Sequence, residues 1–234
     1  MDRERQAAEK QRVYVELRER LITFDLKPGD VLSENALARE TDLGRPAMRE
    51  ILGRLEEEGF ISVHPQKGAV VTAVDPERIR EAVHGHLVLE QNAIRELARR
   101  GLSEEEDGYL TAIFTEMRAA YENGDSLGVI RGSVRFREKI FEIAGRDFLG
   151  DFFRRTDSDL LRVQYLIYVT YGYKSNGSTQ NRHDYSLTEI SLLLTQLRER
   201  QEEAASMLCA NHYSGLLTNA SLLQTIHKKY FVPD

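Results

Sequence analysis

Two arginines one helical turn apart carry the clearest chemical signal in the sequence. Arg45 and Arg49 are four residues apart, so on a helix both guanidinium groups project from one face. A guanidinium can form two parallel hydrogen bonds to guanine or can hold a phosphate group. The alternative is that both arginines form only surface ion pairs, for example with Glu50 or Asp42. The spacing by itself leaves both interpretations open.

A second group of polar side chains lies on apolar helix faces later in the chain. Arg137 shares a helical face with Ser133, Ile130 and Ile140, which predicts that its guanidinium points into the interior. Because a buried guanidinium is costly unless it is paired, we expect Arg137 to hold a small anionic ligand. The alternative is an internal ion pair between Arg137 and Glu90.

Three other residues complete this predicted ligand site. His86 lies on the same helical face as Glu90, and His212 shares a face with Asn219. Imidazole and amide groups can donate or accept hydrogen bonds, so they suit a small polar ligand. The predicted ligand-binding residues are His86, Ser133, Arg137, His212 and Asn219, a choice that also depends on the family resemblance given below.

Composition and missing motifs limit the classes of function. The 234 residues are 41% hydrophobic and 30% charged, as in ordinary globular proteins. No apolar run approaches the ~18 residues of a membrane span, and the single Cys209 suits a reducing cytoplasm. The chain has no glycine-rich phosphate loop, nucleophile elbow or HExxH motif. We therefore expect a cytoplasmic protein that is not an enzyme and has no membrane partner.

The charge balance restricts where nucleic acid could bind. The formal net charge is −6, and residues 1–74 contain 12 Lys and Arg against 14 Asp and Glu. Neither this part nor the remainder is a basic domain, so a DNA contact must come from a local patch.

The elements around Arg45 and Arg49 are predicted from periodicity and capping residues. Apolar spacing predicts a helix over 11–25, and Ser33 is a good N-cap for a second helix that ends near Thr41. Pro46 in its first turn and Gly59 after its last residue delimit a third helix. Both arginines therefore fall at the start of the third helix.

Two short β-favouring runs follow this helix. Residues 60–63 and 69–72 flank a turn, which predicts a hairpin with Gln66, Lys67 and Gly68 at its tip. Helix, helix, tight turn, helix and hairpin in this order form the winged helix-turn-helix arrangement. A small hairpin tip can enter the minor groove or contact phosphate, and the alternative is a solvated loop.

The rest of the chain is predicted to be helical. Capping boxes and glycine stops favour six helices, at 76–100, 104–123, 126–144, 146–171, 187–199 and 201–229, with a long loop at 172–185. The expected fold is mainly α, with a winged helix-turn-helix domain at 1–74 and an all-α six-helix ligand-binding bundle at 75–234.

These segments together resemble a known family. The runs at 28–34, 45–52 and 55–61 resemble the DNA-reading domain of GntR family regulators. The helical remainder, including Phe136 and His212, is similar to the FadR-type effector domain, often called FCD, and six helices would suit its VanR-like branch. The resemblance implies a homodimer that binds palindromic operator DNA and responds to a small-molecule effector.

The resemblance also implies which residues contact DNA. Arg45 and Arg49 match positions that this family uses for DNA contact, whereas Asn35 stands where relatives often carry arginine. The predicted DNA-contact residues are Asn35, Arg45, Arg49, Gln66, Lys67 and Gly68.

The metal site usual in relatives is altered in this sequence. Relatives usually hold a divalent metal with one aspartate and three histidines, but Ser133, Arg137 and Ile190 stand at three of these positions and only His212 matches. One imidazole cannot hold such a metal, so we predict no cofactor. Arg137 would instead supply the positive charge for the effector, with His86 where relatives often use arginine to hold a carboxylate.

Two alternatives remain open at this point. Loss of the metal ligands could mean that the protein is a DNA-binding dimer without effector sensing. A repressor is the favoured interpretation, and an activator is also compatible with the sequence.

Overall fold

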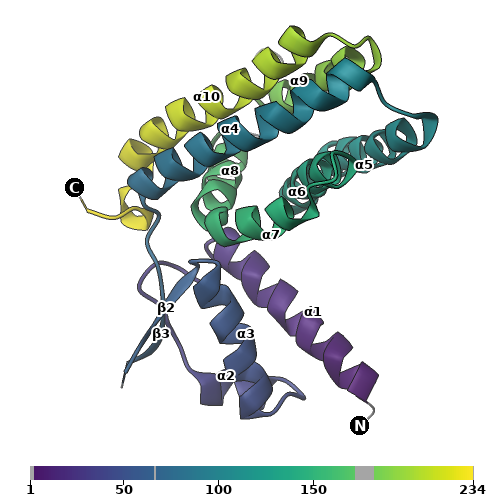
Figure 1. Cartoon of the computed structure of the whole chain (residues 1–234). Coiled ribbons are helices and arrows are strands. Elements are labelled where there is room, and N and C mark those ends of the chain that lie inside the picture. Colours follow the sequence, from purple (N-terminus) through teal and green to yellow (C-terminus); the bar gives the residue numbers. More distant parts are fainter. Residues whose placement is uncertain (1–2, 66, 172–181, 234) are drawn as a thin grey trace.

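The protein divides into a small lower part and a larger helical upper part (Figure 1). The computed structural model describes residues 3–65, 67–171 and 182–233. The lower part contains the first three helices and a small sheet, and the upper part contains all later helices. No helix among the described residues is long and apolar enough to span a membrane.

Three helices form the core of the lower part. They are α1 (Arg3–Ile22), α2 (Glu34–Glu40) and α3 (Arg45–Glu57). The Ser33 hydroxyl caps α2 by accepting a hydrogen bond from the Ala36 amide at 3.3 Å. The buried face of α3 consists of Met48, Ile51, Leu52 and Leu55. This packing leaves the opposite face of α3 to solvent.

The first helix is longer at its N-terminal end than the sequence predicts. It begins at Arg3 instead of residue 11 and ends at Ile22, just before Phe24 adopts a φ of 60°. The early turns are polar and lie outside the apolar face that begins at Val13, so apolar periodicity does not detect them.

A three-stranded antiparallel sheet forms the wing. Its strands β1 (Val31–Leu32), β2 (Ile61–His64) and β3 (Gly68–Val71) lie in the order β1-β3-β2. The predicted hairpin is confirmed by the pairing of β2 with β3, in which His64 lies opposite Gly68. Gly68 has a φ of 88°, a left-handed conformation that favours glycine at the turn. The two-residue β1 is not predicted from the sequence.

Seven α-helices form the upper part in the described residues. They are α4 (Pro76–Arg100), α5 (Glu104–Glu122), α6 (Ser126–Ile143), α7 (Asp147–Thr156), α8 (Ser158–Tyr171), α9 (Arg182–Arg198) and α10 (Glu202–Ile226), followed by a short 3-10 helix (Lys228–Tyr230). The capping box of Ser103 and Glu106 starts α5 as predicted. In Figure 1, α4 and α10 run side by side along the top of the molecule.

The prediction of six helices is therefore wrong. The expected helix at 146–171 is divided into α7 and α8 at Asp157, whose buried side chain makes contacts with other helices. The helix count consequently gives no support to the VanR-like branch. The predicted loop at 172–185 lies mostly outside the described residues, and the chain is already helical at Arg182 rather than from 187.

The C-terminal segment joins the two parts of the molecule. The Val74 amide donates to the Tyr230 carbonyl at 2.8 Å, and the Val232 amide donates to the Val74 carbonyl at 2.9 Å. The aromatic ring of Tyr230 also stacks on Phe24, with ring centroids 4.2 Å apart. The end of the chain thus anchors the connection between the wing and α4.

Candidate DNA-binding surface and ligand cavity

The first turn of α3 presents both predicted arginines to solvent. Arg45 is the first residue of α3, and Arg49 follows one turn later with 76% of its side chain exposed. The Nε and Nη2 atoms of Arg49 donate to the Glu34 carboxylate of α2 at 3.2 and 3.1 Å. The ion pair expected as an alternative therefore forms with Glu34 and not with Glu50 or Asp42. Because an exposed ion pair is weak, Arg49 can exchange Glu34 for another anion at little cost.

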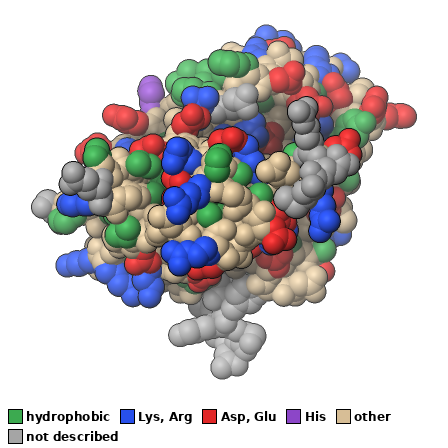
Figure 2. All heavy atoms as spheres, turned by 90° about the horizontal axis from the view of Figure 1, so that it is seen from below, with side chains coloured by type: hydrophobic (Ala, Val, Ile, Leu, Met, Phe, Trp, Pro, Cys, Tyr) green, Lys and Arg blue, Asp and Glu red, His purple; other side chains and the backbone are tan. Residues whose placement is uncertain are grey.

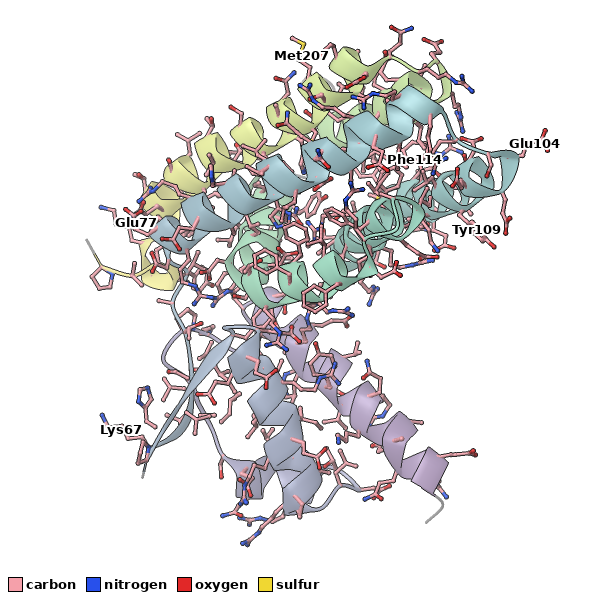
Figure 3. All side chains as sticks on the ribbon, in the orientation of Figure 1. Lys67, Glu77, Glu104, Tyr109, Phe114 and Met207 are labelled. Carbon is pink, nitrogen blue, oxygen red and sulfur yellow. The ribbon has the colours of Figure 1, made fainter. Side chains whose placement is uncertain are left out.

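The other predicted DNA-contact residues lie at the same end of the molecule. Asn35 is exposed on α2, and Lys67 and Gly68 are exposed at the tip of the wing. Figure 3 shows Lys67 at the end of the wing farthest from the helical domain. Gln66 lies outside the described residues.

Arg39 is a further cation on this surface that the sequence analysis did not select. It is exposed near the end of α2, and its Nε donates to the Asn35 carbonyl at 3.1 Å. The sequence could have indicated Arg39, because it lies four residues after Asn35 and therefore on the same face of α2. Figure 2 views this end of the molecule and shows Lys and Arg in separate patches among acidic side chains. This end of the molecule is therefore not uniformly basic.

A small cavity lies inside the helical domain. It has a volume of about 80 Å³ and is lined by residues from six helices: Glu90, Met117, Ser133, Phe136, Arg137, Gln164, Ile167, Tyr168, Ile190, Leu193, His212, Tyr213 and Leu216. This one cavity is lined by Ser133, Arg137, Ile190 and His212, the four residues that the resemblance assigns to metal-ligand positions.

The lining residues do not fit the metal that the resemblance implies. A serine hydroxyl, a guanidinium and an aliphatic side chain replace three ligands of the usual set. In the described parts of the chain, no group of three or more His, Cys, Asp or Glu residues is suited to a metal ion.

Asp157 is the buried centre of the polar network beside the cavity. Its Oδ1 lies 2.7 Å from His86 Nε2, and its Oδ2 accepts a hydrogen bond from Arg137 Nη2. Burial would raise the pKa of Asp157, but the charges of Arg137 and His86 lower it below its ordinary value. Asp157 is therefore a carboxylate that neutralises Arg137.

The predicted internal pair of Arg137 with Glu90 differs from the observed arrangement. Asp157 accepts a hydrogen bond from the Arg137 guanidinium, while Glu90 accepts a hydrogen bond from the Tyr213 hydroxyl at 2.5 Å. Burial, followed by the charge of Glu90, raises the pKa of Tyr213 well above its usual value. Tyr213 is therefore a neutral donor to Glu90.

His86 lies behind the cavity and does not line it. Its ring is fully buried and stacks between Phe153 and Tyr213, with centroid distances of 4.0 and 5.1 Å. Its Nδ1 has no hydrogen-bond partner and lies 3.9 Å from the Glu90 carboxylate. His86 thus orients Asp157 and is separated from any ligand by Tyr213.

The remaining predicted ligand-site residues divide between two environments. Ser133 and His212 line the cavity, and the Ser133 hydroxyl donates to the Ile130 carbonyl at 2.8 Å. His212 Nδ1 lies 2.9 Å from the Glu189 carboxylate, which leaves Nε2 as its other polar atom. Asn219, two helical turns further along α10, is not among the lining residues.

Sequence reasoning missed two polar groups of this site. Asp157 was placed inside a continuous helix, although the run Asp157-Ser158-Asp159 is typical of a helix start and could have indicated the break. The amide of Gln164 lines the cavity, and its buried Oε1 has no hydrogen-bond partner. That orphan acceptor is suited to a donor group on a ligand or to a water molecule.

Comparisons with known proteins place these two surfaces in a family. Residues 9–71 match the family of bacterial regulatory proteins called gntR, and residues 81–215, more than half of the chain, match the FCD domain. An uncharacterized HTH-type transcriptional regulator of Bacillus subtilis, YdhC, is 23% identical over 86% of this chain and 86% of that protein.

Other relatives match shorter stretches. An uncharacterized HTH-type transcriptional regulator of Streptomyces ambofaciens is 41% identical over 70 residues, which are 30% of this chain and 30% of that protein. The gluconate operon transcriptional repressor of Bacillus licheniformis is 37% identical over 93 residues, which are 40% of this chain and 38% of that protein. The chain thus spans well under half the length of these two relatives.

A solved structure shares the whole fold. The E. coli protein McbR/YncC superposes with a TM-score of 0.73 and 21% sequence identity, and the match covers 93% of this chain and 98% of that chain. The winged helix-turn-helix part and the helical domain therefore belong to one recognised architecture. The chain belongs to the gntR family of bacterial regulatory proteins, in the form with an FCD domain, and is a DNA-binding transcriptional regulator.

Proposed function

We propose that this regulator is a repressor that binds operator DNA as a homodimer and releases it when a small anionic molecule enters the cavity of the helical domain. The observation that carries the proposal is the placement of two arginine sites. Arg45 and Arg49 lie on an exposed helix face, whereas Arg137 lines a small cavity in the helical domain.

The DNA contact would use the start of α3 and the tip of the wing. Arg45 and Arg49 would enter the major groove, where arginine can read guanine or hold phosphate. Lys67 would contact the adjacent minor groove or the backbone. Arg49 would leave Glu34 in the process, and the exposure of this ion pair supports such an exchange.

A homodimer would place two copies of α3 about one helical turn of DNA apart, which predicts a palindromic operator. Support comes from an exposed apolar face. Phe148 and Phe152 on α7 are 82% and 45% exposed, and Val88 on α4 is 57% exposed. Gly85 lies next to the Phe152 ring, so α4 and α7 contribute to one surface that a second copy could cover.

The effector would bind in the cytoplasm without a metal. The guanidinium of Arg137 would hold its anionic group, and Ser133 and His212 would supply hydrogen bonds from the cavity wall. The name of the gluconate operon repressor, a relative that also matches this chain, supports repression over activation.

A second candidate function is DNA binding without effector control. The observation in its favour is the neutralisation of Arg137 by Asp157, because a guanidinium that already has a partner needs no ligand. This candidate predicts that no metabolite changes the thermal stability of the protein or its affinity for DNA.

One experiment tests the proposed function in two stages. Operator DNA is selected from a random-sequence pool with the full-length protein, and the affinity for the selected DNA is measured by gel-shift titration. A panel of carboxylates and phosphate esters is then added to the metal-free protein–DNA complex. We expect a palindromic site and its release by at least one anion. Tight operator binding that no anion alters would instead favour the second candidate.

A further inference from the structure

We propose that Asp157 is an internal competitor for the anionic group of the effector, and that its release from Arg137 loosens the attachment of the DNA-binding domain. This inference rests on the proposed function, because it describes how the same cavity would control DNA binding. It assigns a positioning role to the junction of α7 and α8.

The junction contains an unusual concentration of buried polar side chains. Asp157, Ser158, Asp159 and Arg162 are 2%, 0%, 1% and 0% exposed. Buried polar and charged groups are costly unless each has a well-placed partner. The partners of these four residues therefore determine where the first turn of α8 can lie.

One set of partners belongs to the ligand site. The Asp157 carboxylate is held by His86 of α4 and Arg137 of α6. Arg137 lines the cavity directly. The position of Asp157 thus depends on a guanidinium that a ligand in the cavity can reach.

The other set of partners belongs to the DNA-binding domain. Nη1 of Arg162 donates to the Thr72 carbonyl at 2.6 Å, and Nη2 donates to the Thr72 hydroxyl at 3.2 Å. The same guanidinium lies over the Phe60 ring, 5.7 Å from its centroid. Asp159 pairs with Arg162 and thereby holds it in this orientation. Arg162 consequently connects α8 to the residue just before β2 and the residue just after β3, at the base of the wing.

A second contact reaches the end of the DNA-reading helix. Arg78 Nη2 donates to the Ser158 hydroxyl at 3.3 Å, and a Cβ on Gly59 would lie only 2.2 Å from this guanidinium nitrogen. Gly59 follows the last turn of α3, and its carbonyl accepts a hydrogen bond from the Thr72 hydroxyl at 2.8 Å. The first turn of α8 is therefore packed directly against the end of α3.

These contacts give the cavity a physical route to the DNA-binding surface. An anion that binds Arg137 competes with Asp157 for the same guanidinium. Asp157 then loses its main counter-charge while it is still buried, so the carboxylate and the turn that carries it must shift towards solvent or new partners. Because closely packed interfaces have few alternative arrangements, such a shift changes the contacts of Thr72 and Gly59.

The coupling is tested with Asp157→Asn, which removes the charge but keeps the shape. Glu106→Gln is the matched control, since Glu106 also pairs with an arginine and caps a helix but lies away from the cavity lining and from the DNA-binding domain. The readout is hydrogen exchange of the backbone amides at 58–72. We expect exchange about tenfold faster in Asp157→Asn, within the usual range of coupling between sites, and no change in the control. Unchanged exchange in a folded Asp157→Asn protein would overturn the proposal.

The competition is tested with acetate as the anionic probe and acetamide as its neutral analogue, at constant ionic strength. We expect acetate, and not acetamide, to speed exchange at 58–72 in the unmodified protein. Acetate should also bind Asp157→Asn about tenfold more tightly, because its internal competitor is gone. Equal acetate affinity in both proteins, or acetate binding to neither, would overturn the proposal that Asp157 competes with the anion for Arg137.

A second variant keeps the test decisive if Asp157→Asn does not fold. Arg162→Lys retains the charge but cannot make both contacts to Thr72. We expect it to speed exchange at 58–72 and, because coupling between sites is reciprocal, to tighten acetate binding. Unchanged exchange would overturn the proposal. Failure of the proposed function is seen separately, because it would appear as a lack of operator selection by the unmodified protein while the exchange results still stand.

Discussion

Two arginine–carboxylate pairs, one at each candidate site of this regulator, differ in how far they are exposed to solvent. Arg49 and Glu34 meet on an exposed surface, with 76% and 28% of their side chains accessible. Arg137 and Asp157 meet in the interior, with 12% and 3% accessible. An exposed pair is weak and exchangeable, whereas a buried pair is costly to break on one side only. Under the proposed function, Arg49 would exchange Glu34 for DNA at little cost, whereas Arg137 would keep Asp157 until an anion replaced it.

The largest expected effect is on stability at the buried pair. Replacement of Arg137 by Met leaves the Asp157 carboxylate buried without its main counter-charge, which should lower the free energy of unfolding by about 3–5 kcal/mol. Denaturant unfolding measures this change. The double variant Arg137→Met/Asp157→Asn should recover a large part of the loss. If Arg137→Met alone were as stable as the unmodified protein, the buried pair would not be costly to break on one side.

The next largest effect is expected on the affinity for operator DNA. Replacement of Arg49 by Ala should weaken operator binding by about 1–3 kcal/mol if the guanidinium reads a base, as measured by gel-shift titration. The unfolding free energy should stay nearly unchanged because the Glu34 pair is exposed. Arg12→Ala is a suitable control, since Arg12 is another exposed arginine that pairs with acidic neighbours on its own helix. Equal operator affinity of Arg49→Ala and the unmodified protein would reject the assignment.

A smaller effect is expected from the partner of Arg49. Glu34→Gln removes a carboxylate that competes with DNA, so operator binding should strengthen by up to about 1 kcal/mol, the usual upper value for an exposed pair. The same titration measures it. Weaker binding would instead indicate that Glu34 positions Arg49 for the groove.

The smallest expected effect is on the pH dependence of stability at the ion pair of Arg100 and Glu106, whose burial is intermediate between those of the other two pairs. The hydrogen bond from Arg100, against a modest opposing effect of burial, lowers the pKa of Glu106 to about 2 from 4.5. A carboxyl whose pKa is lowered in the folded state adds stability above its unfolded pKa and loses it as the pH falls through the folded value. The loss should therefore lie between about pH 4.5 and 2, and should stay below about 1 kcal/mol because the pair is partly exposed.

Denaturant unfolding across this pH range provides the measurement. In Glu106→Gln, the contribution of this residue to the slope of stability against pH should vanish. A variant with the same slope as the unmodified protein would show that the Arg100 pair does not persist in solution.

Much of the DNA-binding end was predictable from the sequence. Ser33, Pro46 and Gly59 mark helix ends through their own backbone chemistry, and the four-residue spacing of Arg45 and Arg49 places both on one face. The partner of Arg49 was not predictable, because Glu34 lies fifteen residues earlier on a different helix.

The cavity was predictable only in part. Helical periodicity directed Arg137 inward, and the family resemblance brought Ser133, Ile190 and His212 to the same wall. The roles of His86 and Asn219 were not captured, because the exact depth and rotation of α4 and α10 decide which of their polar groups reach the cavity.

By itself, the sequence determined the local elements, the winged helix-turn-helix order and the exposed arginine pair, since capping and periodicity act over a few residues. Only the tertiary structure decided that the predicted helix at 146–171 breaks at Asp157 and that this carboxylate neutralises Arg137. The physical reason is that a buried charge takes its partner from whichever helix packs against it, and that choice is made by long-range packing.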